Sequence, residues 1–239
     1  MSTPGLWCVV PAAGRGLRVG GDRPKQYLPI AGRLLIEHTL DRLARHPGIV
    51  GLMVVLSPGD AFWPGLDKLH RKPVRTTSGG AERCDSVLAG LQALPAEIDE
   101  TDFVLVHDAA RPCVRLDDIS RLIGTAGAGD GGLLGAPLRD TLKRADEGCR
   151  SALTEPRDQR WRAFTPQMFR RGALSAALRQ ASRRGIAVSD EAMAMELAGH
   201  APLLVEGAED NIKVTTAADF ALAEFLLGRT APAGEGVTR

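Results

Sequence analysis

The sequence predicts an α/β fold, in which helices flank a mainly parallel sheet and a β-arm protrudes from it. Three observations support this prediction. Short apolar runs, which are typical of buried strands, alternate with segments of helical spacing. Small or polar residues follow three of these runs. A segment at about 137–160 lacks the apolar content of a core element.

The apolar runs and the helical segments follow one another in a regular order. The predicted strands span 6–10, 50–56, 73–77, 102–107, 131–136 and 202–206. The predicted helices span 34–46, 60–71, 81–94, 116–126, 170–184, 190–199 and 216–227. Thr216 is placed to cap the last helix, with Asp219 in its first turn. This order predicts a sheet that is covered on both faces.

The segment 137–163 differs in character from the rest. Two stretches rich in charged and polar residues flank a turn-like sequence at Asp146, Glu147 and Gly148. We interpret the segment as a β-hairpin arm, and such an arm often buries its apolar face on a partner subunit. The expected organisation is one domain over 1–230, including a dimerisation arm at about 137–160, and a disordered tail at 231–239.

Composition excludes several classes of protein. The chain has 239 residues and a formal net charge of +1, so its overall charge does not favour nucleic-acid binding. No apolar run reaches the roughly 18 residues of a membrane span, and the N-terminus does not resemble a signal peptide. The four cysteines are far apart, which predicts neither a zinc site nor a disulfide framework. We therefore expect a cytoplasmic protein without membrane or nucleic-acid partners.

The loop after the first strand is built from small residues, Pro11 to Gly14, so backbone amides there can approach a ligand closely. The cations Arg18 and Lys25 follow at the carboxyl end of the strand. Together they suggest a polyphosphate site, and hence a protein that handles a nucleotide. The alternative is an ordinary tight turn with solvated cations. A dinucleotide fingerprint would need glycine where Val19 stands.

Two further segments fall where strands end, and ligands bind outside the carboxyl ends of parallel strands. Gly80 can bring backbone against a base, and Ser86 can hydrogen-bond to a base edge; the alternative is a plain helix N-terminus. Asp108, three residues before Arg111, can hold sugar hydroxyls or metal; the alternative is an Asp–Arg pair that stabilises a loop. We interpret His107 as a structural histidine.

Taken together, these segments resemble the 2-C-methyl-D-erythritol 4-phosphate cytidylyltransferase family. The resemblance runs from about residue 6 to 228 in the order of the family, and the HDAAR and NIKVT strings make it specific. The matching strings are Val10–Gly14, Pro24–Tyr27, Arg83–Val87, Val106–Arg111, Arg139–Lys143 and Asn211–Thr215.

This resemblance implies a Rossmann-like nucleotidyltransferase domain of the GT-A-like kind and a homodimer joined through the arm. It implies an enzyme that joins CTP and 2-C-methyl-D-erythritol 4-phosphate. The products would be 4-diphosphocytidyl-2-C-methyl-D-erythritol and pyrophosphate, in the non-mevalonate isoprenoid pathway. Mg²⁺ is implied as cofactor, held mainly through the substrate phosphates, with no metal ligand assigned to the protein.

The resemblance also implies roles for individual residues. Arg18 and Lys25 match the pair that stabilises the transition state around the α-phosphate. Arg157 and Lys213 match the pair that positions the sugar phosphate, with Arg157 expected to reach in from the neighbouring subunit. The remaining positions implied to bind substrate are Ala12, Ala13, Gly14, Gly80 and Ser86 for the nucleotide, Asp108, Arg111, Thr141 and Ser189 for the sugar phosphate, and Pro11 and Ala109 with no choice between the two substrates.

Two positions depart from the family pattern. Ala81 stands where the family often has an acidic or polar residue near the base, and Ser189 stands where it often has threonine. The hydroxyl is kept at Ser189, so we expect little change there. Alternative functions remain open: a pentitol-phosphate cytidylyltransferase, which shares the first motif, and a nucleotide-sensing module without chemistry. The glycine register disfavours a nicotinamide dehydrogenase.

Overall fold

The centre of the molecule is a sheet whose strands lie in the order β12-β8-β11-β7-β1-β4-β6-β5. The structure is a computed structural model that describes residues 5–14 and 23–230. Neighbouring strands are parallel except at β11 and β5, which are antiparallel to their neighbours. The strands are β1 (Leu6–Pro11), β4 (Ile49–Leu56), β5 (Lys68–Leu69), β6 (Lys72–Ser78), β7 (Phe103–Val106), β8 (Gly132–Pro137), β11 (Trp161–Arg170) and β12 (Leu203–Glu206).

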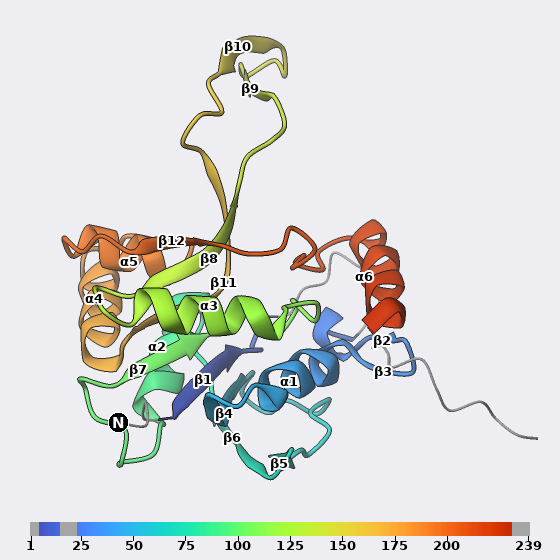
Figure 1. Cartoon of the computed structure of the whole chain (residues 1–239), viewed down its shortest axis with the longest axis vertical. Coiled ribbons are helices and arrows are strands. Elements are labelled where there is room, and N and C mark those ends of the chain that lie inside the picture. The colour runs from blue at the N-terminus through green and yellow to red at the C-terminus, as the bar shows by residue number, and fades with distance from the viewer. Residues whose placement is uncertain (1–4, 15–22, 231–239) are drawn as a thin grey trace, which may run out of the picture.

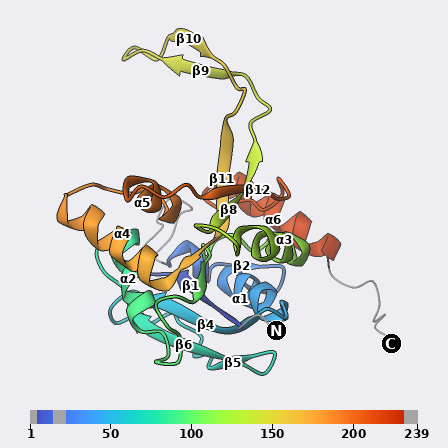
Figure 2. The ribbon, with the colours of Figure 1, turned by 60° about the vertical axis from the view of Figure 1, so that its left-hand side comes forward.

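Helices cover both faces of this sheet, as Figures 1 and 2 show. One layer holds α1 (Leu35–Arg45) and α3 (Leu116–Ala126), and the other holds α2 (Arg83–Gln92), α4 (Arg171–Arg183) and α5 (Glu191–Leu197). The predicted α/β fold, a mainly parallel sheet flanked by helices, is therefore confirmed.

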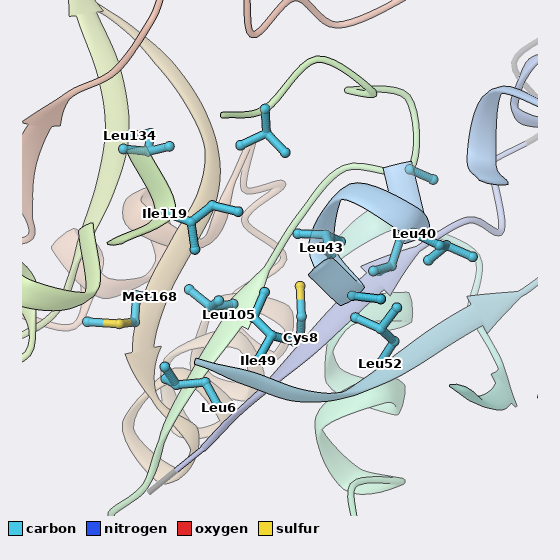
Figure 3. Packing of buried hydrophobic residues seen from close by; sticks show 14 of the residues in the cluster. Leu6, Cys8, Leu40, Leu43, Ile49, Leu52, Leu105, Ile119, Leu134 and Met168 are labelled. Atoms are coloured by element: carbon cyan, nitrogen blue, oxygen red, sulfur yellow. The ribbon is translucent and has the colours of Figure 1, made fainter. Parts of the chain in front are cut away.

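The strand β1 explains why both faces of the sheet are apolar. Successive side chains of a strand point to opposite faces. Cys8 lies in the core shared with α1 and α3, whereas Trp7 and Val9 lie in the core shared with α2, α4 and α5. Figure 3 shows Cys8 among the buried side chains beneath Leu43 of α1. Burial on both faces makes the strand read as a continuous apolar run.

A third, smaller core joins α6 (Ala217–Thr230) to β2 (Pro29–Ile30). In the sequence, β2 lies between the short elements η2 (Lys25–Tyr27) and β3 (Arg33–Leu34). Ile30 packs with Val214 and with Ala223 of α6. The Thr216 hydroxyl accepts a hydrogen bond from the Asp219 amide at 3.2 Å, as predicted for the cap of this helix.

Two segments differ from the sequence prediction. No helix spans 60–71; this stretch is an irregular loop that leads into β5. Its apolar residues imitate helical spacing, but Gly59 and Gly65 adopt positive φ angles of 68° and 73°, which a helix does not contain. Conversely, the long strand β11 was not predicted. Pro166 and a register shift between Ala163 and Gln167 interrupt its strand pattern.

The segment predicted as an arm is a hairpin of β9 (Leu142–Ala145) and β10 (Ser151–Glu155), so this prediction is confirmed. The Asp146 carboxylate accepts hydrogen bonds from the amides of Gly148 and Arg150 and so holds the turn. Figures 1 and 2 both show the hairpin standing away from the body. Within the described residues, no helix has the length and apolar character needed to cross a membrane.

Candidate active site

Three loops meet at the carboxyl ends of the parallel strands and enclose a pocket of about 420 Å³. The loops follow β1, β6 and β7, which lie close together in the sheet. The η2 turn and the segment before α6 complete the wall. The lining residues are Pro11, Ala12, Ala13, Gly14, Lys25, Gln26, Gly80, Ala81, Glu82, Arg83, Ser86, Asp108, Ala109, Ala110, Lys213 and Thr215.

Most of the residues that the sequence suggested for catalysis or substrate binding line this one pocket. They are Pro11, Ala12, Ala13, Gly14, Gly80, Ser86 and Ala109, together with Lys25, Asp108 and Lys213. Lys25 and Lys213 are 188 positions apart in the sequence. The fold therefore brings two cations and a small-residue loop to one place. Arg18 and the tail 231–239 lie outside the described residues.

Close backbone approach at Gly79 shapes one wall of the pocket. A Cβ atom built at Gly79 would lie 2.6 Å from the Ser86 hydroxyl and 2.9 Å from Cβ of Ala13, so no larger residue fits without a shift. The Ser86 hydroxyl donates a hydrogen bond to the Glu82 carbonyl at 3.1 Å. Its lone pairs remain suited to accept a hydrogen bond from a ligand amine.

Asp108 is the most heavily engaged side chain of the pocket. Its carboxylate lies 3.1 Å from Arg83, 3.4 Å from Arg111 and 3.0 Å from Lys213. Burial alone would raise the pKa of Asp108, but the charges of Arg83, Lys213 and Arg111 outweigh burial and hold it well below its ordinary value. The carboxylate is therefore ionised and fixes three cations at the pocket.

Lys213 reaches the pocket because its segment is tied to the loop after β7. The Val214 amide donates to the Ala110 carbonyl at 2.8 Å, and the Arg111 guanidinium donates to the Asn211 carbonyl at 2.7 Å. The Lys25 ammonium in turn donates to the Val214 carbonyl at 2.7 Å. Lys25 and the Lys213 segment are thus held against each other.

Arg111 is buried beneath the pocket and does not line it. Its guanidinium contacts Asp108, lies over the ring of Phe164 and donates to the Asn211 carbonyl. This matches the alternative for the Asp108–Arg111 spacing, a pair that stabilises a loop. A contact between Arg111 and the second substrate stays a prediction.

His107 has the structural role that the sequence suggested. Its Nε2 lies 3.0 Å from the Arg111 carbonyl, to which only an N–H can donate. Its Nδ1 therefore accepts from the Thr165 hydroxyl, and the Thr165 oxygen accepts from the Asp108 amide. Burial lowers the pKa of His107 to about 4, so the ring is neutral. The chain of hydrogen bonds holds Asp108 in place.

Three residues predicted for the second substrate lie outside the pocket of their own chain. Thr141 and Arg157 belong to the arm and are exposed, and the Arg157 guanidinium donates to the Arg139 carbonyl. Ser189 is exposed just before α5, with its hydroxyl 3.5 Å from the Met193 sulfur. None of the three is among the residues that line the pocket of Lys213 within one chain, so their contact with the second substrate stays a prediction.

Two residues of the site had no role in the sequence prediction. Arg83 bridges Asp108 and Glu191, and Glu191 is fully buried at the start of α5. Burial raises the pKa of Glu191, while Arg83 favours its ionised form. Arg83 lies within a string that the sequence singles out, and Glu191 lies two residues after Ser189, but their spacing of 108 positions gives no sign that they meet.

Among the described residues, no group of three or more His, Cys, Asp or Glu side chains could hold a metal ion. Asp108, the buried carboxylate that lines the pocket, is already surrounded by three cations. These surroundings do not suit a metal site that is built from protein ligands alone.

Comparisons with known proteins agree with this geometry. The family model described as IspD, 2-C-methyl-D-erythritol 4-phosphate cytidylyltransferase, matches residues 6–229. A protein of that name from Stenotrophomonas maltophilia (strain R551-3) is 56% identical over 227 residues, which cover 95% of this chain and 98% of the relative. One from Xanthomonas euvesicatoria pv. vesicatoria (strain 85-10) is also 56% identical, over 94% of this chain and 86% of the relative.

Solved structures give the same result at lower identity. The crystal structure of Francisella tularensis 2-C-methyl-D-erythritol 4-phosphate cytidylyltransferase is 31% identical, with a TM-score of 0.80 over 93% of this chain and 99% of that chain. The enzyme of the same name from Thermus thermophilus is 32% identical, with a TM-score of 0.77 over 93% and 98% of the two chains. The chain belongs to the 2-C-methyl-D-erythritol 4-phosphate cytidylyltransferase family.

Proposed function

We propose that this chain transfers a cytidylyl group from CTP to 2-C-methyl-D-erythritol 4-phosphate. The products are 4-diphosphocytidyl-2-C-methyl-D-erythritol and pyrophosphate, in the non-mevalonate isoprenoid pathway. The observation that carries the proposal is the meeting of Lys25 and Lys213 in one pocket at the carboxyl ends of the strands. Two substrates that both carry phosphate repel each other, and cations that meet in one pocket offset that repulsion.

In this proposal the nucleotide occupies the pocket between the loops after β1 and β6. The loop Pro11–Gly14 faces the triphosphate, because small residues allow close contact with backbone amides. Gly80 and Ser86 face the base, and Ala109 lies against the sugar. Ala81 also lines the pocket, and its methyl group offers no hydrogen bond to a base, so backbone and Ser86 carry the recognition of cytosine.

The reaction needs no general base from the protein. The attacking phosphate has a second pKa of about 6, so it is mostly dianionic at neutral pH. One of its oxygens bonds to the α-phosphorus of CTP, and the bond from that phosphorus to the bridging oxygen breaks. Pyrophosphate leaves with the electron pair. Negative charge grows on the α-phosphate oxygens, and we assign Lys25 and Arg18 to stabilise it.

We assign Lys213 and Arg157 to hold the sugar phosphate in line for attack. Lys213 is already fixed by Asp108 at 3.0 Å, so its charge is in place before the substrate arrives. Arg157 lies on the arm, outside the pocket of its own chain. We therefore propose a homodimer joined through the arm, in which Thr141 and Arg157 serve the pocket of the neighbouring subunit. Ser189 and Arg111 complete the proposed second site.

Mg²⁺ is proposed as the metal that accompanies CTP, bound mainly through its phosphates. The carboxylate of Asp108 is occupied by cations, so no step of the reaction is assigned to a metal held by the protein. We further propose that residues 1–230 act as one domain and that the enzyme works in the cytoplasm.

Pyrophosphate release from CTP tests this function. Turnover should require both Mg²⁺ and 2-C-methyl-D-erythritol 4-phosphate. A pentitol phosphate in its place should give little product. Turnover with the pentitol phosphate instead would favour the rival cytidylyltransferase, and CTP binding without any turnover would favour a nucleotide-sensing module.

A further inference from the structure

Three successive carbonyl groups of the loop after β1 are held by side chains from two other segments. The Gln26 side-chain amide donates to the Ala12 carbonyl at 2.6 Å and to the Gly14 carbonyl at 3.1 Å. The Ser57 hydroxyl donates to the carbonyl between them, that of Ala13, at 2.7 Å. Because all three partners are acceptors, both side chains act as donors here.

These contacts determine where the loop amides point. In a trans peptide the C=O of one residue and the N–H of the next lie in one plane and point in opposite directions. Holding the Ala12 carbonyl on Gln26 therefore turns the Ala13 N–H away from Gln26. Holding the Ala13 carbonyl on Ser57 likewise turns the Gly14 N–H away from Ser57. Within the described residues, neither of these two N–H groups donates a hydrogen bond.

Both side chains are themselves well anchored. Gln26 is 4% exposed and sits in η2 next to Tyr27, whose hydroxyl donates to Asp60 at 2.7 Å. Ser57 directly follows β4, and the Ala12 amide donates to the Val55 carbonyl of that strand at 2.8 Å. The loop is thus fixed from the sheet on one side and from η2 on the other. The same η2 turn carries Lys25.

We propose that Gln26 and Ser57 are positioning residues that fix the directions of the Ala13 and Gly14 amides, so that the amide on the pocket side meets the polyphosphate of CTP. The inference rests on the proposed function for the identity of the nucleotide. Because Gln26 and Ser57 hold the loop from opposite sides, the two amides point to opposite sides of the loop. The amide that faces the pocket would then meet the anion together with the Lys25 ammonium, which also lines the pocket. Neither Gln26 nor Ser57 needs to touch the substrate in order to act.

The variants Ser57→Ala and Gln26→Leu test this role. Each should raise the KM for CTP about tenfold, as expected when a hydrogen bond of ordinary strength no longer holds a binding group. The KM for the sugar phosphate should stay within twofold of the wild-type value. Ser57→Thr keeps the hydroxyl and should restore the KM for CTP. The exposed residues of α4 supply matched controls, Ser182→Ala and Gln180→Leu, which should behave as wild type.

Calorimetric binding of inorganic tripolyphosphate and of cytidine separates positioning from loss of structure. Ser57→Ala should weaken tripolyphosphate binding about tenfold and leave cytidine binding unchanged. Equal weakening of both probes, or a KM for CTP within twofold of wild type in Ser57→Ala, would overturn the inference. The Ser57 test is decisive even if Gln26→Leu fails to fold. Absence of turnover in the wild type would reject the proposed function. The binding of tripolyphosphate would still show whether Ser57 positions the loop for an anion.

Discussion

The pocket and the arm both lie at the carboxyl edge of the sheet, but different contacts stabilise them. β8 runs in the same direction as β7, because β11 is antiparallel to both, so the arm starts at the carboxyl edge where the pocket lies. The pocket is held by buried contacts such as Asp108 with Arg83 and Lys213. The arm is held by its own hairpin, and almost all of its side chains are exposed. One chain therefore forms the pocket by itself, and the arm lies outside that pocket, which is the arrangement that the proposed dimer requires.

The largest effect is expected on the pocket side. Lys25→Ala should lower kcat by about 10²–10³-fold, since a single group aimed at developing charge contributes this much. Pyrophosphate release under saturating substrates measures it, with Lys68→Ala on the exposed strand β5 as the control. A kcat for Lys25→Ala within threefold of wild type would show that Lys25 does not stabilise the transition state.

A smaller and more selective effect is expected at Lys213, which we assign to the second substrate. Lys213→Ala should raise the KM for the sugar phosphate about 10–100-fold, the loss expected for a hydrogen bond to a charged group. The dissociation constant for CTP, measured by calorimetry, should change by less than about threefold. Equal effects on both substrates would mean that Lys213 serves the nucleotide as well.

The buried network of the pocket should also give it a pH dependence that the arm lacks. The neutral His107 has a pKa of about 4, below the value of about 6.5 of an exposed histidine, so the unfolded chain takes up the proton first as pH falls. The stability due to this difference is complete above pH 6.5 and is lost toward pH 4, by at most about 1.4 kcal/mol per pH unit.

Denaturant unfolding between pH 4.5 and 6 measures that loss. His107→Gln should flatten the slope of unfolding free energy against pH by about one proton per chain. His70→Gln, at an exposed position, should keep most of the slope. If the slope of unfolding free energy against pH is unchanged in His107→Gln, His107 has the same protonation in the folded and the unfolded chain.

The smallest effect is expected at the helix cap that follows Lys213. Hydrogen bonds from Thr215 and Thr216 lower the pKa of Asp219 to about 2. Asp219→Ala should reduce stability by about 1 kcal/mol, as is usual for a lost cap, and Asp219→Asn should lose less. Thermal unfolding at neutral pH compares the two variants. Equal stability of Asp219→Ala and wild type would show that the cap adds nothing beyond the packing of α6.

The sequence predicted the pocket better than it predicted the contacts around it. Runs such as 6–10 and 116–126 have an apolar spacing that depends only on neighbouring residues, so these strands and helices could be predicted. The edge of the sheet where the loops meet follows from the order of these elements. The helix predicted over 60–71 was wrong because Gly65, and Gly59 just before the range, adopt positive φ angles that break a helix, although the apolar spacing imitates one. β11 was missed because Pro166 interrupts its pattern.

Pairings between distant residues could not be predicted, for a physical reason. The Arg83–Glu191 ion pair and the Gln26 and Ser57 contacts depend on which loops lie side by side, and a local pattern carries no information about that. The same limit applies to the arm. Its hairpin follows from local turn residues, but the position of Arg157 relative to a second pocket depends on how two chains pack.

Mixing of inactive subunits tests most directly the claim that one chain builds the nucleotide site and the arm of another completes it. Co-expression of Lys25→Ala and Arg157→Ala chains in equal amounts should give heterodimers in half of the molecules. One site of each heterodimer then has an intact Lys25 and an intact arm from its neighbour, so about a quarter of wild-type activity should return. Activity no higher than the average of the two variants would show that Arg157 serves its own chain or none.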